Sequence, residues 1–112
     1  MSPVTPLFRR DGIDVLLVSV ELWPQHLVVR LAASGELAEQ LGSDLLTPLE
    51  VAVEDDLGTT YTPRSSNTGG TGSEWHGDWF FAAAVPNSVA RLRVRVASSY
   101  GEVAAVDVEL AE

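Results

Sequence analysis

The chain has 112 residues, a hydrophobic fraction of 46% and a charged fraction of 21%, values that fit one globular domain and exclude a disordered segment. Its net charge is −9, from 16 acidic and 7 basic residues, and such an anionic surface disfavours binding to nucleic acids and to acidic membranes. The sequence contains no cysteine, which excludes disulfides, cysteine-based metal sites and thiol nucleophiles.

No segment near the start is typical of an export signal or of a membrane span. Residues 1–10 lack the continuous apolar core of a signal peptide, and no apolar run approaches the roughly 20 residues needed to cross a bilayer. We therefore expect a cytoplasmic protein without membrane insertion; an extracellular location is the alternative if a leader has been removed. All 7 basic residues are arginine, a usage that suggests a GC-rich bacterial genome.

Apolar and polar residues alternate along much of the chain, which predicts β-strands. Residues 13–22 are apolar on both faces for part of their length, which suits a strand covered on two sides. Pro24 interrupts this pattern and predicts a turn to a second strand, where residues 27–33 alternate. Residues 34–42 start with a serine and end with a glycine, and they predict one short crossover helix between sheets.

A glycine then fixes the register of a hairpin. Residues 49–54 alternate as a strand, and Gly58 suits the left-handed position of a three-residue loop. This loop sets Val53 opposite Tyr61 and Val51 opposite Pro63 in the following strand. Residues 65–73 consist of serine, asparagine, threonine and glycine, so we expect a flexible loop there.

The last third of the chain predicts a strand at residues 78–84 and a second hairpin, with Gly101 in the left-handed position of its loop. The residues set opposite one another are Arg91 and Glu109, Leu92 and Val108, Arg93 and Asp107, Val94 and Val106, Arg95 and Ala105, and Val96 and Ala104. Opposite charges across a ladder add about 0.2–1 kcal/mol per pair. We therefore interpret the arginine stripe as structural and not as an anion-binding site.

Together these elements predict one all-β domain over residues 1–112, with residues 1–11 as a loosely ordered N-terminal arm. About seven or eight short antiparallel strands, with turns roughly every ten residues, fit an immunoglobulin-like β-sandwich with one short crossover helix. A βαβ fold would need repeated helical segments, which the sequence lacks.

No catalytic or cofactor motif is evident. His26 and His76 are the side chains that titrate near neutrality, and no Gly-x-Ser-x-Gly elbow accompanies them. The glycine stretch at 69–72 lacks a P-loop lysine and precedes a strand. The acidic residues Glu54, Asp55 and Asp56, with Asp78 or Glu74, are candidate calcium ligands, but the pattern of a calcium loop is absent. We expect no enzyme, no cofactor and no metal, and we interpret the acidic tip as a solvated turn.

The segment 74–81 is the most suggestive of binding because it holds two of the 3 tryptophans. A strand that begins at Trp75 places that residue on the same face as Trp79 and Phe81, which suit a sandwich core. Trp75 then either contributes to a binding platform beside the 65–73 loop or closes the end of the sandwich. The candidate binding residues are Trp75, His76, Tyr61 and Arg64.

The turn and core motifs of the chain are Asp55-Asp56-Leu57-Gly58-Thr59-Thr60-Tyr61, Gly69-Gly70, Trp75-x-Gly77, Phe80-Phe81, Val85-Pro86 and Leu92-x-Val94. They resemble those of bacterial immunoglobulin-like domains of unknown function. The pattern is similar to immunoprotective extracellular antigens of mycobacteria and to sandwich domains of bacterial surface lipoproteins and anti-sigma factors. The resemblance covers roughly residues 13–110; it implies the fold and supplies no active residues.

The sequence thus predicts a non-catalytic binding or scaffolding module that contacts an unknown protein partner and no nucleic acid. A homodimer through an exposed edge strand is a second use of the same fold. The alternative function is binding of a small ligand, a carbohydrate or a calcium ion, at the loop end of the sandwich. Sugar binding would need Trp75 or Trp23 to be exposed.

Overall fold

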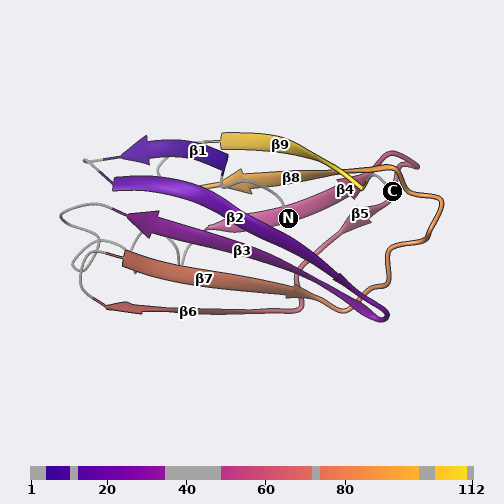
Figure 1. Ribbon diagram of the computed structural model, residues 1–112, viewed down its shortest axis with the longest axis horizontal. Helices are drawn as coiled ribbons and strands as arrows, with labels where there is room; N and C mark the ends of the chain where they lie inside the picture. Colours follow the sequence, from indigo (N-terminus) through magenta and orange to yellow (C-terminus); the bar gives the residue numbers. More distant parts are fainter. Residues whose placement is uncertain (1–4, 11–12, 35–48, 72–73, 99–102, 111–112) are drawn as a thin grey trace.

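The computed structural model describes residues 5–10, 13–34, 49–71, 74–98 and 103–110. Over these residues the chain forms strands that run mostly along the 42 Å long axis of the molecule (Figure 1). The strands are β1 (Thr5–Arg10), β2 (Ile13–Trp23), β3 (His26–Ser34), β4 (Glu50–Asp55), β5 (Thr60–Tyr61), β6 (Ser65–Thr71), β7 (Glu74–Phe81), β8 (Arg91–Ala97) and β9 (Val103–Glu109).

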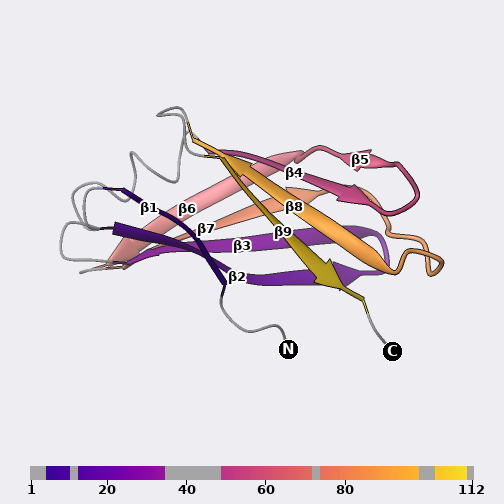
Figure 2. The same cartoon turned by 90° about the horizontal axis from the view of Figure 1, so that it is seen from above.

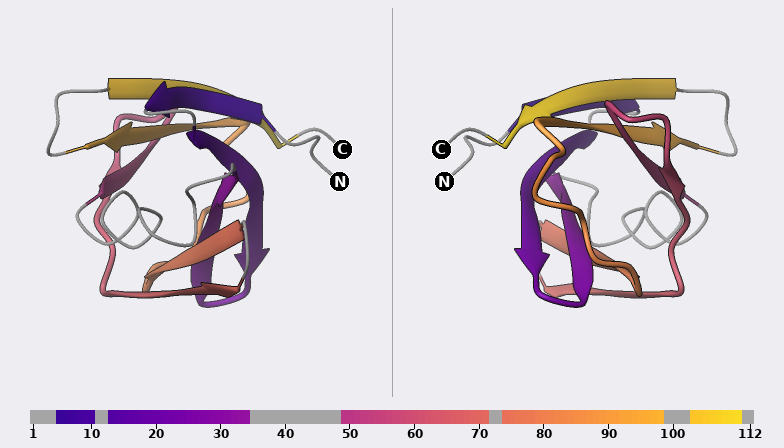
Figure 3. Two further views of the ribbon diagram at one scale, coloured as in Figure 1. Left: turned by 90° about the vertical axis from the view of Figure 1, so that its left-hand side faces the viewer. Right: turned by 90° about the vertical axis from the view of Figure 1, so that its right-hand side faces the viewer.

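Two antiparallel sheets pack face to face as a sandwich. Sheet A has the order β1-β2-β3-β7-β6 and sheet B the order β5-β4-β8-β9. In Figure 2, β8 and β9 of sheet B cross in front of β3 and β7 of sheet A. On one side of the sandwich the edge strands β1 and β9 lie side by side (Figure 3). On the other side, β6 and the short β5 are the last strands of their sheets. The all-β sandwich expected from the sequence is confirmed.

The core follows from the alternation of side chains along each strand. In β8, Leu92, Val94 and Val96 are fully buried, while the three arginines that alternate with them are exposed. Alternate residues of β2, β3, β4 and β7 fill the rest of the space between the sheets. These core residues include Ile13, Val15, Leu17, Leu27, Val29, Leu31, Ala33, Val51, Val53, Trp79 and Phe81.

The six pairs predicted between β8 and β9 are all present. In the first hairpin Val53 pairs with Tyr61 as predicted, but β5 ends there, so the predicted pair of Val51 with Pro63 does not form. Arg93 contacts Asp107 at 2.8 Å, and Arg91 contacts Glu109 at 2.9 Å. Arg95 faces an alanine on β9 and instead contacts Glu54 of β4 at 3.1 Å.

Three expectations need correction. Residues 65–71 are not a flexible loop but strand β6, because β7 offers its backbone groups along their whole length. The described strands number nine, not seven or eight. Part of the expected N-terminal arm is ordered, since residues 5–10 form β1 against β2. The described residues contain no helix; Ser34 ends β3, and the rest of the predicted helix lies outside the described residues.

A close contact between a glycine and a tryptophan holds β6 and β7 in place. Gly77 points into the sandwich beneath the Trp79 indole, and a Cβ there would lie 2.6 Å from Trp79 Cζ3 and 3.2 Å from Thr68 Cγ2. Thr68 is the β6 residue paired with Gly77. The indole packs directly on the backbone of residue 77. Any side chain at position 77 would displace the indole, which explains why a glycine lies in the middle of this strand.

Candidate functional site

The four candidate binding residues lie at two ends of the sandwich. Trp75 pairs with Ala33 near one end of β7. Arg64 is at the other end, where its N–H donates to the carbonyl of Phe80 at 2.7 Å. Five residues separate Trp75 from Phe80, which is about 16 Å at about 3.3 Å per residue. The structure therefore does not bring the four residues into one site, and a binding role for each stays a prediction.

Trp75 and His76 point to opposite faces of β7. Trp75 is half-buried and packs against the core, and its buried Nε1 has no hydrogen-bond partner in the described part of the chain. This packing agrees with a tryptophan that closes the end of the sandwich. His76 is exposed on the outer face of sheet A, opposite Ala32 and Gly69.

Tyr61 is buried and its hydroxyl takes part in a hydrogen-bonded turn. The hydroxyl donates to Asp55 Oδ2 at 2.8 Å, while Asp55 Oδ1 accepts from the N–H groups of Leu57 at 3.0 Å and Thr59 at 2.8 Å. Gly58 completes the turn with a φ of +93°, a conformation that favours glycine. Burial and the bond to Asp55 raise the pKa of Tyr61 to about 12. Burial alone would raise the pKa of Asp55, but its hydrogen bonds outweigh this effect and hold the pKa below its usual value.

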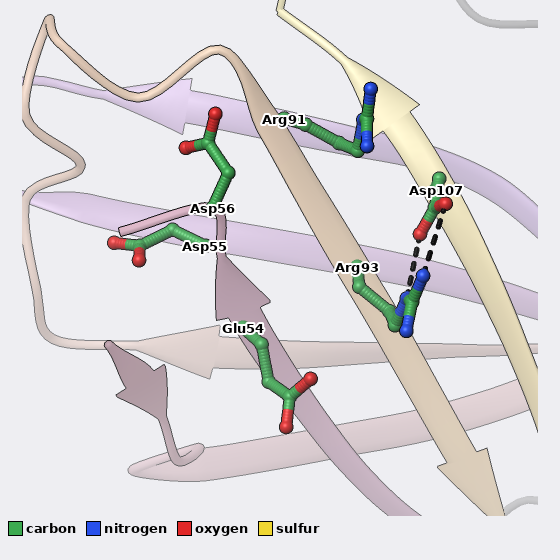
Figure 4. Close-up of a pocket in the computed structure, with 6 residues that line it drawn as sticks. All are labelled: Glu54, Asp55, Asp56, Arg91, Arg93 and Asp107. Carbon is green, nitrogen blue, oxygen red and sulfur yellow. Dashed lines mark hydrogen bonds and ion pairs between the residues drawn. The ribbon is translucent and has the colours of Figure 1, made fainter. Parts of the chain in front are cut away.

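A shallow hollow of about 150 Å³ lies over the outer face of sheet B (Figure 4). Four carboxylates and two arginines line it: Glu54, Asp55, Asp56, Asp107, Arg91 and Arg93. The hydrogen bond from Arg93 holds the pKa of Asp107 below its usual value, and Asp56 accepts a hydrogen bond from Ala90 N–H at 3.3 Å. Arg93 and Asp107 bond to each other, whereas Glu54 bonds to Arg95 and Arg91 bonds to Glu109. No group of three metal-ligating side chains occurs among the described residues.

The sequence analysis named Trp23 only as an alternative residue for sugar binding, and the structure places it at the exposed end of the β2–β3 hairpin. Trp23 is 50% exposed and its neighbour Leu22 is 46% exposed. One face of the Trp23 indole stacks on His26, with ring centroids 5.6 Å apart and an angle of 9° between the planes. Strict alternation along residues 13–23 would place Trp23 on the core face. The irregularity in β2 between Leu17 and Ser19 moves it to the outer face, beside Glu21.

Polar contacts fix the surroundings of Trp23. Its Nε1 donates to Glu21 Oε1 at 3.4 Å. Arg30 contacts Glu21 at 2.8 Å and Asp78 at 2.9 Å, so one arginine joins β2, β3 and β7 across the outer face of sheet A. Its hydrogen bond holds the pKa of Glu21 below its usual value. Glu21, which accepts the hydrogen bond from Trp23, is therefore itself held in place by Arg30.

Comparisons with known proteins support the fold. No family model matches the chain, and no curated protein matches its sequence. Among solved structures, the chain is similar to the archaellum periplasmic stator protein FlaG from Sulfolobus acidocaldarius, with a TM-score of 0.51 and 9% identity over 82% of this chain and 95% of that one. At this identity the likeness shows a shared β-sandwich fold.

Two expectations are not upheld by this comparison. The cytoplasmic location expected from the N-terminal residues is contradicted, because the structurally similar protein is periplasmic. The bacterial origin expected from composition gains no support, because that protein is archaeal. No helix of the described residues is long and apolar enough to cross a membrane.

Proposed function

We propose that this chain is a non-catalytic β-sandwich module that acts through protein contacts, outside the cytoplasm, within a larger assembly. The observation that carries the proposal is the pair of exposed apolar side chains, Leu22 and Trp23, at the end of the β2–β3 hairpin. The fold is shared with a protein named as a periplasmic stator, which supports both the location and the mode of action.

The Trp23 tip, defined as Leu22, Trp23 and His26, has the properties of a binding hot spot. Tryptophan is enriched among residues that dominate protein interfaces, and a solvated indole gains free energy when a partner covers it. The stack on His26 and the bond to Glu21 restrict the ring before binding. A restricted side chain loses less conformational entropy on association.

The strand order supports the finer assignment to the immunoglobulin-like class. Strands β2-β3-β7-β6 face β5-β4-β8-β9, which follows the ABED and CFG sheets of an immunoglobulin domain with one further strand beside C. Strand β1 is an addition at the edge of sheet A. Domains of this class commonly serve as contact modules in assemblies, and the sequence resemblance to extracellular immunoglobulin-like domains agrees with such a role.

A contact role for His76 and Arg64 belongs to the same proposal, since both side chains are exposed. Trp75 and Tyr61 contribute from within the fold: Trp75 packs on the core, and Tyr61 holds the β4–β5 turn.

The proposal is tested by quantitative capture of partners from detergent extracts of the native cells. Trp23→Ala should reduce capture of the main partner by about 30-fold, the effect of losing the roughly 2 kcal/mol of a hot spot. The matched control is Leu57→Ser, which removes an apolar side chain that is 59% exposed at a different hairpin; it should leave capture unchanged. Equal capture by wild type and Trp23→Ala would refute the proposal.

Carbohydrate binding at Trp23 is the second candidate function. One indole face is covered by His26, while the residue as a whole remains half exposed; a free ring face beside a carboxylate is the arrangement that sugar rings stack on. A panel of sugars titrated against tryptophan fluorescence tests it, with Trp23→Phe as the control. A saturable change that Trp23→Phe abolishes would favour the sugar over the protein partner.

A further inference from the structure

In the described part of the chain, the side of the sandwich opposite β1 and β9 presents two strand edges. Strand β6 is the last strand of sheet A and bonds only to β7 within the described residues. On the facing sheet, β5 covers only Val53 and Glu54 of β4. The first half of β4, residues 50–52, therefore pairs with β8 alone in the described part of the chain.

A groove of about 370 Å³ lies between these edges, with Leu49, Glu50, Val51, Pro63, Arg64, Ser65, Ser66 and Trp79 along it. Its floor belongs to the hydrophobic core, because Leu49, Val51 and Trp79 are each at most 6% exposed. Glu50 and Arg64 are exposed at its rim. The volume lies within the range of about 300–1,000 Å³ found for binding clefts.

Strand β6 lacks the features that protect edge strands. Natural edges carry charged residues or proline, or are very short. The edge strand β1 contains Pro6 and Arg9, and β5 has two residues. The seven residues of β6 include no charge and no proline.

We propose that this groove, bounded by β4 and β6, receives an extended, positively charged segment of a partner protein. The segment pairs with β6 as a further strand of sheet A, and its inward side chains enter the groove above the buried Leu49, Val51 and Trp79. Strand addition of this kind takes affinity from backbone hydrogen bonds and specificity from alternate side chains.

Charge and shape decide between this occupant and a second copy of the chain. The net charge of −9 attracts a basic segment and opposes the approach of another copy. Pairing of β6 with β6 would bring only serine, asparagine, threonine and glycine residues to the groove, whereas a partner strand can bring larger side chains that fill it. The groove lies three strand spacings from β2, about 14 Å across sheet A, so it is a different surface from the Trp23 tip. The proposal about the groove is therefore tested separately from the proposed function.

The test uses the full chain, labelled with ¹⁵N, and an N-acetylated, C-amidated seven-residue peptide with valine at alternate positions, threonine between them and lysine at both ends. We expect saturable chemical-shift changes and slowed amide exchange along β6. The affinity should fall as salt rises, and a peptide with glutamate in place of lysine should bind at least ten times more weakly.

Two variants on β6 locate the contact. Ser66 pairs with Trp79 and Asn67 pairs with Asp78, so their side chains lie on the inner and outer faces of sheet A, and both residues are exposed. Ser66→Lys places a charge over the groove and should weaken peptide binding at least tenfold. Asn67→Lys makes the same charge change on the same strand and should alter binding less than twofold.

Absence of shifts along β6 at millimolar peptide would overturn the proposal, as would equal effects of the two variants. Concentration-dependent changes along β6 without peptide would also overturn it, in favour of a second copy as the occupant. Thermal melts of both variants check that each remains folded.

Discussion

Replacement of Tyr61 by phenylalanine tests the turn between β4 and β5, because it removes one hydroxyl from a buried ring and preserves its shape. That hydroxyl donates to Asp55 Oδ2 at 2.8 Å. A hydrogen bond to a charged group contributes about 1.5–3 kcal/mol. Asp55 keeps its bonds from the N–H groups of Leu57 and Thr59, so we expect the lower end of this range.

A loss of about 1.5 kcal/mol corresponds to a fall in Tm of roughly 6–12 °C, at about 4–8 °C per kcal/mol for a domain near this size. Differential scanning calorimetry and urea unfolding at pH 7 measure it. A variant within about 0.3 kcal/mol of wild type would refute the assignment of Tyr61 to the turn.

The same pair predicts how stability depends on pH. The pKa of Tyr61 is about 12 in the folded chain, against a usual value of 10.0. Between these values the unfolded chain loses a proton that the folded chain keeps, so wild-type stability should fall as the pH rises from 10 to 12. Tyr61→Phe should lose this part of the pH dependence. The pKa of Asp55 is lowered, so its contribution is present above its usual pKa and is lost as the pH falls through the folded-state value.

Two further predictions concern the core and the surface. Gly77→Ala should destabilise the fold by about 1–3 kcal/mol and change tryptophan fluorescence, because its Cβ would overlap the Trp79 indole. The matched control is Gly69→Ala on the neighbouring strand, where a Cβ would meet nothing within 4 Å. Equal urea midpoints for the two variants would contradict the contact. Arg93→Gln should leave the Tm nearly unchanged, because the ion pair of Arg93 is exposed. Leu92 is fully buried on the same strand, so Leu92→Ala should lower the free energy of unfolding by about 2–5 kcal/mol. A larger loss of stability for Arg93→Gln than for Leu92→Ala in calorimetry would contradict the view that the exposed arginines contribute little to stability.

The parts of the fold that were predicted correctly are those with two independent local signals. In β8 and β9, a hairpin glycine and the alternation of arginine with apolar residues agree on one register. In β4 and β5, Gly58 and the alternating strand before it do the same. A slip by one residue would place arginines in the core, so the sequence strongly restricts this register.

Strand β6 was missed because nothing in its own sequence favours a strand. Serine, asparagine and glycine are typical of loops, and the strand forms because β7 supplies hydrogen bonds and Gly77 admits the Trp79 indole. Both causes lie in the tertiary structure.

A binding role for Trp75 stays a prediction, because the residue is half-buried and packs on the core. A more exposed tryptophan lies at a hairpin of two turn residues, where Trp23 pairs with His26. Strict alternation along residues 13–23 would place Trp23 on the core face, and the irregularity in β2 between Leu17 and Ser19 moves it to the outer face. Periodicity in the sequence does not locate such an irregularity.

The most direct test of a protein-contact role is photocrosslinking in the native cells from a benzoyl-phenylalanine placed at position 23, with position 103 as the control. Val103 is 72% exposed and lies on sheet B. We predict one dominant protein adduct from position 23 and none of the same mass from position 103. No protein adduct from position 23, or the same adducts from both positions, would contradict the account.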